Sequence, residues 1–212
     1  MASSRFPGKP LADIMGLPMV EHVRRRTALC PLIRDVVVAT CDREILEAVA
    51  ACGGKAVMTA STHERGTDRI AEAARSIACD VVLNVQGDEP LVRPEMFEPL
   101  LAPLLNDPEV LCTNLVTEIV DEAEFESPDV VKTVFDTRGD VIYFSREPIP
   151  SRSKAGRIAF KKHKQLGIIA FRSGILQRFA TLPPTPLERI ESVDMMRLIE
   201  RGQVKLDEKV RS

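Results

Sequence analysis

Hydroxyl, cationic and glycine residues are concentrated at the start of the chain, where Ser3, Ser4 and Arg5 precede Gly8 and Lys9. Hydroxyls and backbone N–H groups can bond phosphate oxygens, an arginine can fork onto them, and a lysine adds a point charge. This composition suits a polyphosphate, and a nucleoside triphosphate is the ligand that we expect. Such loops in α/β proteins follow a buried strand, whereas only two residues precede Ser3, so we expect the chain to begin inside the domain.

A second candidate segment is 86–90, Gln-Gly-Asp-Glu-Pro, which directly follows the apolar run 80–85. Ligands of open α/β sheets bind beyond the carboxyl ends of the strands, so Asp88 is placed to hold a divalent cation. A carboxylate suits Mg²⁺, which usually takes one or two carboxylates and fills its other positions with phosphate oxygens and water. The alternative is a plain turn, since Gly-Asp and Glu-Pro are common turn dipeptides, and this segment alone favours neither interpretation.

A third candidate segment, 63–69, combines a glycine and a hydroxyl with cations at the predicted start of a helix. Helix N-termini favour anions and hydrogen-bond acceptors. Taken by itself, an N-cap with a solvated helix face is the more common explanation of such a segment, and His63 carries no argument alone.

These segments would be positioned by an alternation of short apolar strands and amphipathic helices. The pattern predicts strands at 35–40, 55–59, 80–85, 110–117 and 166–171, and helices at 45–50, 67–77, 94–105, 173–180 and 186–200. It also predicts a hairpin over 130–144 and a loop over 148–156. Alternation of this kind indicates one α/β domain over 1–212, with a mainly parallel sheet covered by helices on both faces.

Composition excludes several classes of function. The 29 basic and 31 acidic residues give a formal net charge of −2, and no basic block exceeds Arg24–Arg26, which argues against nucleic-acid binding. No apolar run approaches the roughly 18 residues that a membrane span requires. The five cysteines are odd in number and form no Cys-x-x-Cys pair, so we expect free thiols in a reducing cytoplasm rather than disulfides or zinc ligands.

The segments 2–11, 66–69 and 84–90, which overlap the three candidate segments, closely resemble the CMP-Kdo synthetases, the 3-deoxy-manno-octulosonate (Kdo) cytidylyltransferases, in order and spacing. Any one motif would be weak evidence, whereas this number of motifs in one order is specific. The similarity continues over nearly the whole chain, at 131–132, 143–146, 149–150, 166–168 and 185–191. The resemblance implies a Rossmann-like (GT-A-like) nucleotidyltransferase fold with a mixed, mainly parallel sheet and an inserted β-hairpin region, and it implies a homodimer.

The implied reaction transfers CMP from CTP to the anomeric hydroxyl of Kdo with release of pyrophosphate, which supplies a lipopolysaccharide precursor. Mg²⁺ is the implied cofactor, and catalysis would rest on positioning and electrostatics without a covalent intermediate. The CTP-binding residues would be Ser3, Ser4, Arg5, Lys9, Gly66, Thr67, Asp68, Arg69 and Gln86, of which Arg5 and Lys9 would act in catalysis together with the metal ligand Asp88.

The acidic sugar would be bound by Gln86, Arg146, Gln165, Glu188 and Glu191. Among these, Arg146 is the candidate for the sugar carboxylate, because its planar fork can bond both oxygens. Glu188 and Glu191 are candidates for the sugar hydroxyls, with the alternative that one of them faces solvent on its helix.

The chain departs from the family pattern in three places. We expect it to lack the apolar first strand with its Ile-Pro-Ala-Arg type ending, and the late Gly-Val-Asp-Thr-Pro type segment whose aspartate is the second metal carboxylate, so a weakened magnesium site and poor activity are expected. Gln165 and Ile169 replace a histidine and a tyrosine that approach the sugar in the family. The acceptor therefore stays open between Kdo, an amino-modified Kdo, another acidic sugar and a phosphonate. A chain that binds nucleotide or a partner subunit without turnover is the alternative from another class.

Overall fold

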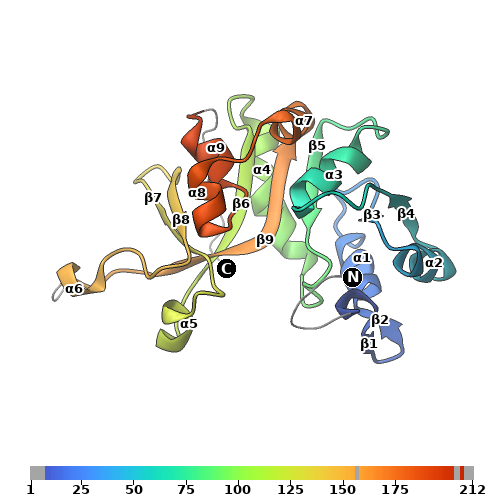
Figure 1. Ribbon diagram of the computed structural model, residues 1–212, viewed down its shortest axis with the longest axis horizontal. Helices are drawn as coiled ribbons and strands as arrows, with labels where there is room; N and C mark the ends of the chain where they lie inside the picture. Colours follow the sequence, from blue (N-terminus) through green and yellow to red (C-terminus); the bar gives the residue numbers. More distant parts are fainter. Residues whose placement is uncertain (1–7, 156–157, 203–205, 208–212) are drawn as a thin grey trace.

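The computed structural model describes residues 8–155, 158–202 and 206–207. Its main sheet is six-stranded and mixed, with β10 (Leu206–Asp207), β6 (Cys112–Glu118), β9 (His163–Arg172), β7 (Lys132–Phe135) and β8 (Val141–Ser145) in that order. The sixth strand, β5 (Val81–Val85), also pairs with β9. Figure 1 shows β9 as the long strand that crosses the molecule between the other strands.

Strand β9 decides the character of this sheet. It runs antiparallel to β5, β6 and β7, whereas β10 runs parallel to β6. The prediction of a mainly parallel sheet is therefore wrong. The β5–helix–β6 alternation does produce two strands of the same direction, but β9, which comes later in the chain, lies between them. Apolar periodicity identifies a strand and carries no information about which strands become its neighbours.

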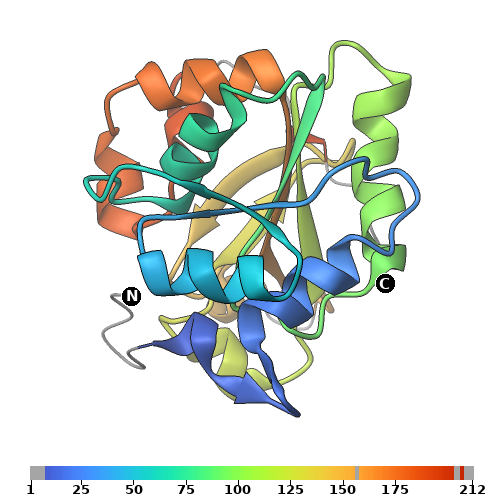
Figure 2. The ribbon, with the colours of Figure 1, turned by 90° about the vertical axis from the view of Figure 1, so that its right-hand side faces the viewer.

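Helices cover both faces of the sheet, as the sequence predicts. One face carries α3 (Gly66–Ala74), α7 (Ser173–Thr181), α8 (Pro186–Glu191) and α9 (Met196–Glu200), and the other carries α1 (Met19–Thr27) and α4 (Phe97–Asn106). Figure 2 shows the two layers on opposite sides. Successive residues of β9 point to opposite faces of the sheet. Ile169 and Phe171 therefore pack in the apolar core on the side of α3 and α7, while Ile168 and Ala170 pack in the core on the side of α1 and α4.

A separate two-stranded parallel sheet consists of β3 (Val37–Thr40) and β4 (Lys55–Met58), joined by α2 (Arg43–Ala51). Within the described residues no strand joins β3 to β5, and a cavity of about 940 Å³ lined by both strands lies there. The hydroxyl of Thr27, buried in the lining of this cavity, has no hydrogen-bond partner.

Several shorter elements differ from the prediction. The helix predicted over 186–200 is interrupted because Ser192 takes a left-handed conformation (φ 53°), so α8 and α9 are separate. The predicted loop at 148–156 contains the short helix α6 (Arg152–Ala155). The sequence pattern gave no indication of η1 (Lys9–Leu11), β1 (Asp13–Ile14), β2 (Leu17–Pro18), α1 or α5 (Glu122–Glu126), and it did not separate η2 (Pro94–Met96) from α4. In the described part of the chain no helix has the length and apolar character needed to cross a membrane.

Candidate active site

Two of the predicted catalytic residues meet in the structure. The Lys9 Nζ donates a hydrogen bond to Asp88 Oδ2 at 2.8 Å, although 79 positions separate the two residues in the sequence. Both side chains are about one third to two fifths exposed, at 34% and 42%. Ser3, Ser4 and Arg5 lie outside the described residues, so their predicted roles stay predictions.

The backbone on each side holds this pair in place. Gly8 adopts a left-handed conformation (φ 74°) that turns the chain into η1, where the Leu11 N–H donates to the Gly8 carbonyl at 2.8 Å. Leu11 then packs against the apolar cluster of Val20, Ile45 and Val49. On the other side, Asp88 lies in the turn that follows β5. The neighbouring Glu89 has a pKa above its ordinary value, because it is half-buried and faces the charge of Asp88.

Gln86, at the end of β5, lies across Gly167 of β9. The Gln86 N–H donates to the Gly167 carbonyl at 3.2 Å. A Cβ atom added to Gly167 would lie 2.6 Å from Gln86 Cδ and 2.7 Å from its Oε1. The absence of a side chain at 167 therefore makes room for the Gln86 amide. Two positions along β9, Gln165 donates from its Nε2 to Asn114 Oδ1 at 2.5 Å, a partner that the sequence analysis did not identify.

The side chains of segment 66–69 are engaged with the protein. Thr67 donates its hydroxyl proton to Asp194 Oδ2 at 2.5 Å, and Asp68 forms an ion pair with Arg197 at 3.2 Å. Arg69 donates to Thr59 Oγ1 at 2.6 Å and to a backbone carbonyl. Thr67 and Asp68 thus attach the start of α3 to the segment that carries α8 and α9, while Gly66 and Arg69 line the cavity beside β5. Nucleotide binding by this segment stays a prediction.

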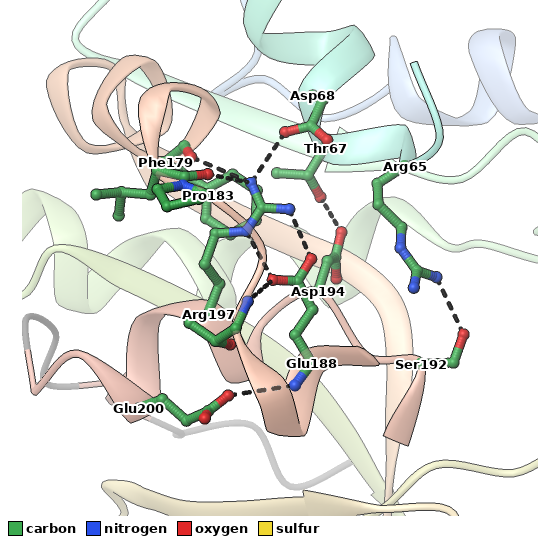
Figure 3. A network of polar contacts seen from close by, with 12 residues as sticks. Arg65, Thr67, Asp68, Phe179, Pro183, Glu188, Ser192, Asp194, Arg197 and Glu200 are labelled. Atoms are coloured by element: carbon green, nitrogen blue, oxygen red, sulfur yellow. Dashed lines mark hydrogen bonds and ion pairs between the residues drawn. The ribbon is translucent and has the colours of Figure 1, made fainter. Parts of the chain in front are cut away.

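A buried polar network surrounds Arg197 (Figure 3). Its guanidinium donates to both carboxylate oxygens of Glu188, at 2.8 and 2.6 Å, and lies 4.2 Å above the ring centroid of Phe179. Glu188 also accepts a hydrogen bond from the Thr185 N–H at 3.1 Å. The side chains of Glu188 and Arg197 are only 1% and 2% exposed. The predicted contact between Glu188 and a sugar stays untested, and this burial favours a role in holding Arg197.

Asp194 belongs to the same region and is only partly exposed to solvent. Burial raises its pKa above the ordinary value, while the hydrogen bond from Thr67 and the charges of Arg65 and Arg197 act in the opposite direction. Neither Asp194 nor Arg197 was identified from the sequence. The signal in the sequence that could have found them is that both are charged residues within the otherwise apolar segment 193–199.

Glu191 and Arg146 form a second polar cluster, between β8 and the end of α8. The Glu191 carboxylate accepts hydrogen bonds from Tyr143 Oη (3.0 Å), Ser145 Oγ (3.1 Å) and the Arg146 backbone N–H (2.8 Å). The Arg146 guanidinium donates to the carbonyls of Glu191, Pro128 and Ser192. Within the described residues no carboxylate forms an ion pair with Arg146. Its positive charge is therefore held in position by neutral acceptors.

Comparison with solved structures establishes the class of protein. The chain superposes with a TM-score of 0.90 on a CMP:2-keto-3-deoxy-manno-octonic acid synthetase solved in complex with CTP, at 41% identity over 99% of this chain and 86% of that one. The similarity to a putative glucose-1-phosphate thymidylyltransferase from Bacillus anthracis is in fold alone, with a TM-score of 0.60 at 15% identity over 95% of this chain and 78% of that one. The fold is that of a mixed α/β nucleotidyltransferase.

Sequence comparison gives the family. A family model described as cytidylyltransferase matches residues 1–209. The chain is 46% identical to a 3-deoxy-manno-octulosonate cytidylyltransferase of Geobacter metallireducens, over 95% of this chain and 83% of that protein. A protein of the same name from Escherichia coli is 42% identical, over 94% of this chain and 80% of its own length. The chain belongs to the cytidylyltransferase family.

Proposed function

We propose that this protein transfers CMP from CTP to 3-deoxy-manno-octulosonate and releases pyrophosphate. The observation that carries the proposal is the meeting of Lys9 with Asp88 at the carboxyl end of β5, in a chain 41–46% identical to proteins that carry this activity in their names or bind CTP. In this reaction the anomeric oxygen of the sugar forms a bond to the α-phosphorus as the bond to the β-phosphate oxygen breaks. The hydroxyl proton is released.

The cation of Lys9 supports the triphosphate side of this proposal. A positive charge beside the leaving pyrophosphate offsets the negative charge that grows there, which is the main way in which such enzymes accelerate phosphate transfer. The ion pair with Asp88 holds Lys9 in position until a nucleotide arrives. In the proposal, Ser3, Ser4 and Arg5 complete this loop, and Gly66 to Arg69 lie on the nucleotide side.

Mg²⁺ fits Asp88 as a single protein carboxylate. No group of three or more acidic, histidine or cysteine side chains in the described part of the chain could hold a metal ion without other ligands. Mg²⁺ commonly binds through one or two carboxylates and completes its shell with phosphate oxygens and water, so CTP would supply the remaining ligands. When bound, the ion would neutralise charge on the triphosphate.

The acceptor side of the proposal rests on Arg146. Its guanidinium has no carboxylate partner among the described residues and is fixed by three carbonyls. A fixed, unneutralised arginine suits the carboxylate of an acidic sugar. Gln86 and Gln165 offer amide groups to the sugar hydroxyls, and Glu191 orients Arg146 from behind. A cytoplasmic location, a homodimer and the supply of a lipopolysaccharide precursor complete the proposal.

A second candidate acceptor is another acidic sugar, because Gln165 lies where the related synthetases are expected to carry histidine. The experiment measures pyrophosphate release from CTP and Mg²⁺ with Kdo, and with UTP replacing CTP as a control. Calorimetric titration of CTP is run beside it. Pyrophosphate release with Kdo and CTP, but not with Kdo and UTP, supports the proposal. CTP binding without release on Kdo would assign a different acceptor, and absence of CTP binding would refute nucleotidyl transfer by this chain.

A further inference from the structure

The inference concerns a β-bulge at the centre of the main sheet. Strands β6 and β9 pair in one register at Asn114, opposite Ile169, and in another at Val116, opposite Gln165. One residue of β6 therefore faces three residues of β9, 166–168. Bulges of this kind change the direction of side chains and are common beside active sites. Here the bulge separates Gln165 from Gly167, on which the Gln86 amide lies.

Asn114 closes the bulge from inside the sheet. Its side chain is 2% exposed, and its Nδ2 donates to the carbonyls of Leu115 (2.9 Å) and Leu166 (3.3 Å). Only the NH₂ end of an amide can donate to carbonyl oxygens, so these two backbone groups fix which way round the Asn114 amide lies. The Asn114 Oδ1 must then point the other way, toward Gln165.

The orientation of Gln165 follows from that of Asn114. Because Asn114 presents an oxygen, Gln165 must present its NH₂ group, and the Nε2-to-Oδ1 distance is 2.5 Å. The remaining oxygen of Gln165, Oε1, accepts no hydrogen bond from any described residue. The carbonyls of Leu115 and Leu166 thus fix the Asn114 amide, and Asn114 in turn fixes the Gln165 amide. The group of Gln165 that is left without a partner among the described residues is its Oε1, a hydrogen-bond acceptor.

We infer that Asn114 is a positioning residue for the acceptor, which holds the Gln165 amide so that its Oε1 binds a hydroxyl or ammonium donor of the sugar. This inference rests on the proposed function. It assigns opposite tasks to two parts of the site: Arg146 binds the carboxylate, and Gln165 binds a donor. A neutral amide held by another neutral amide also makes this contact independent of pH, unlike a histidine at the same position.

The first test compares three variants in steady-state kinetics. Asn114→Ala and Gln165→Ala each remove the contact, so each is expected to raise the KM for the acceptor about five- to tenfold, as for one hydrogen bond, with the KM for CTP unchanged. The double variant is expected to be no worse than Gln165→Ala, because both act through one contact. Equal rises in both KM values, or additive effects in the double variant, would overturn the inference.

Thr113→Val provides the matched control for damage to the strand. Thr113 is the neighbour of Asn114 on β6, is equally buried at 1% exposure, and donates its hydroxyl to the Leu100 carbonyl of α4 at 2.8 Å. The Thr113→Val substitution removes a buried hydrogen bond of β6 on the face of the sheet opposite to Asn114. The acceptor KM is expected to stay within about twofold of the wild-type value, and a rise equal to that of Asn114→Ala would refute a specific role for Asn114.

A second readout does not depend on turnover. The side-chain NH₂ signals of Gln165, assigned by their loss in Gln165→Ala, are followed by ¹H–¹⁵N NMR. The inference expects a downfield, slowly exchanging proton in the wild type that moves to the position of a free amide in Asn114→Ala but not in Thr113→Val. An unchanged signal would overturn the inference even if the enzyme is active, whereas the expected change without activity on Kdo would refute only the proposed function.

Discussion

Replacing Glu188 separates two roles for this residue, as a sugar ligand and as the buried partner of Arg197. Glu188→Gln keeps the shape of the side chain but removes the charge that faces Arg197, and its NH₂ group would point at the guanidinium donors. Removal of one partner from a buried pair costs about 3–5 kcal/mol. Asp68, 3.2 Å from Arg197, still balances part of the charge, so we expect a loss near the lower limit.

A loss of about 3 kcal/mol corresponds to a fall in Tm of roughly 6–12 °C for a chain of this size. Thermal and urea denaturation would measure it, and kinetics at a temperature where the variant is folded would measure the acceptor KM. We expect that KM to stay within about twofold of wild type. Glu64→Gln, at an exposed position, serves as the control and should change neither quantity.

The double variant Glu188→Gln with Arg197→Met checks the cause of the loss. Once both charged groups are gone, no buried guanidinium is left without its partner, so the double variant is expected to cost less than the sum of the two single variants. An unchanged Tm for Glu188→Gln together with a tenfold rise in acceptor KM would refute this reasoning and restore Glu188 as a sugar ligand.

Three further changes probe the site and its support. Lys9→Ala is expected to lower kcat/KM for pyrophosphate release about 10²- to 10³-fold with little change in Tm, because exposed ion pairs contribute at most about 1 kcal/mol; an unaltered rate would exclude Lys9 from catalysis. Gly167→Ala places a Cβ 2.6 Å from Gln86 Cδ, so we expect it to displace that amide and raise the acceptor KM, while CTP titration stays as in the wild type. Asp194 has a raised pKa, so its contribution to stability is fully present below the ordinary aspartate pKa and is lost as pH rises through the folded value. Asp194→Asn, whose oxygen can still accept from Thr67, is therefore expected to raise Tm at neutral pH and to flatten its decline above pH 4, as Tm measured across pH would report.

The sequence predicts the local elements well because each depends on its own residues. The strands at 37–40, 55–58 and 81–85 lie within the predicted ranges, and the hairpin of β7 and β8 ends one residue beyond the predicted range. The neighbours of β9 could not be predicted, since its antiparallel position between β5 and β6 depends on pairing between residues more than forty positions apart. The sequence also contained no indication that the helix predicted over 186–200 would be interrupted at Ser192, because serine seldom adopts a left-handed conformation.

The residues of the candidate site also differ in whether the sequence alone could predict them. Lys9 and Asp88 could be placed together because ligand sites of α/β folds lie at the carboxyl ends of strands, and this rule needs no pairing information. Asn114 could not be found, because a buried asparagine in an apolar strand is visible only through the bulge that it closes. Its importance depends on the register shift between β6 and β9 and not on its neighbours in the sequence.

Charge balance distinguishes the candidate ligands better than residue type does. The charge of Glu188 is neutralised by a buried arginine, so binding a sugar would require this pair to open. The charge of Lys9 is balanced by the partly exposed carboxylate of Asp88. A phosphate could take the place of Asp88 beside Lys9, and a metal ion could take the place of Lys9 beside Asp88, at little cost. The Arg146 guanidinium donates only to carbonyls among the described residues, so an incoming anion would not have to displace a carboxylate from it. A site that presents one replaceable cation and one unneutralised cation is suited to two anionic substrates, a nucleoside triphosphate and an acidic sugar, which is the pair that the proposed reaction joins.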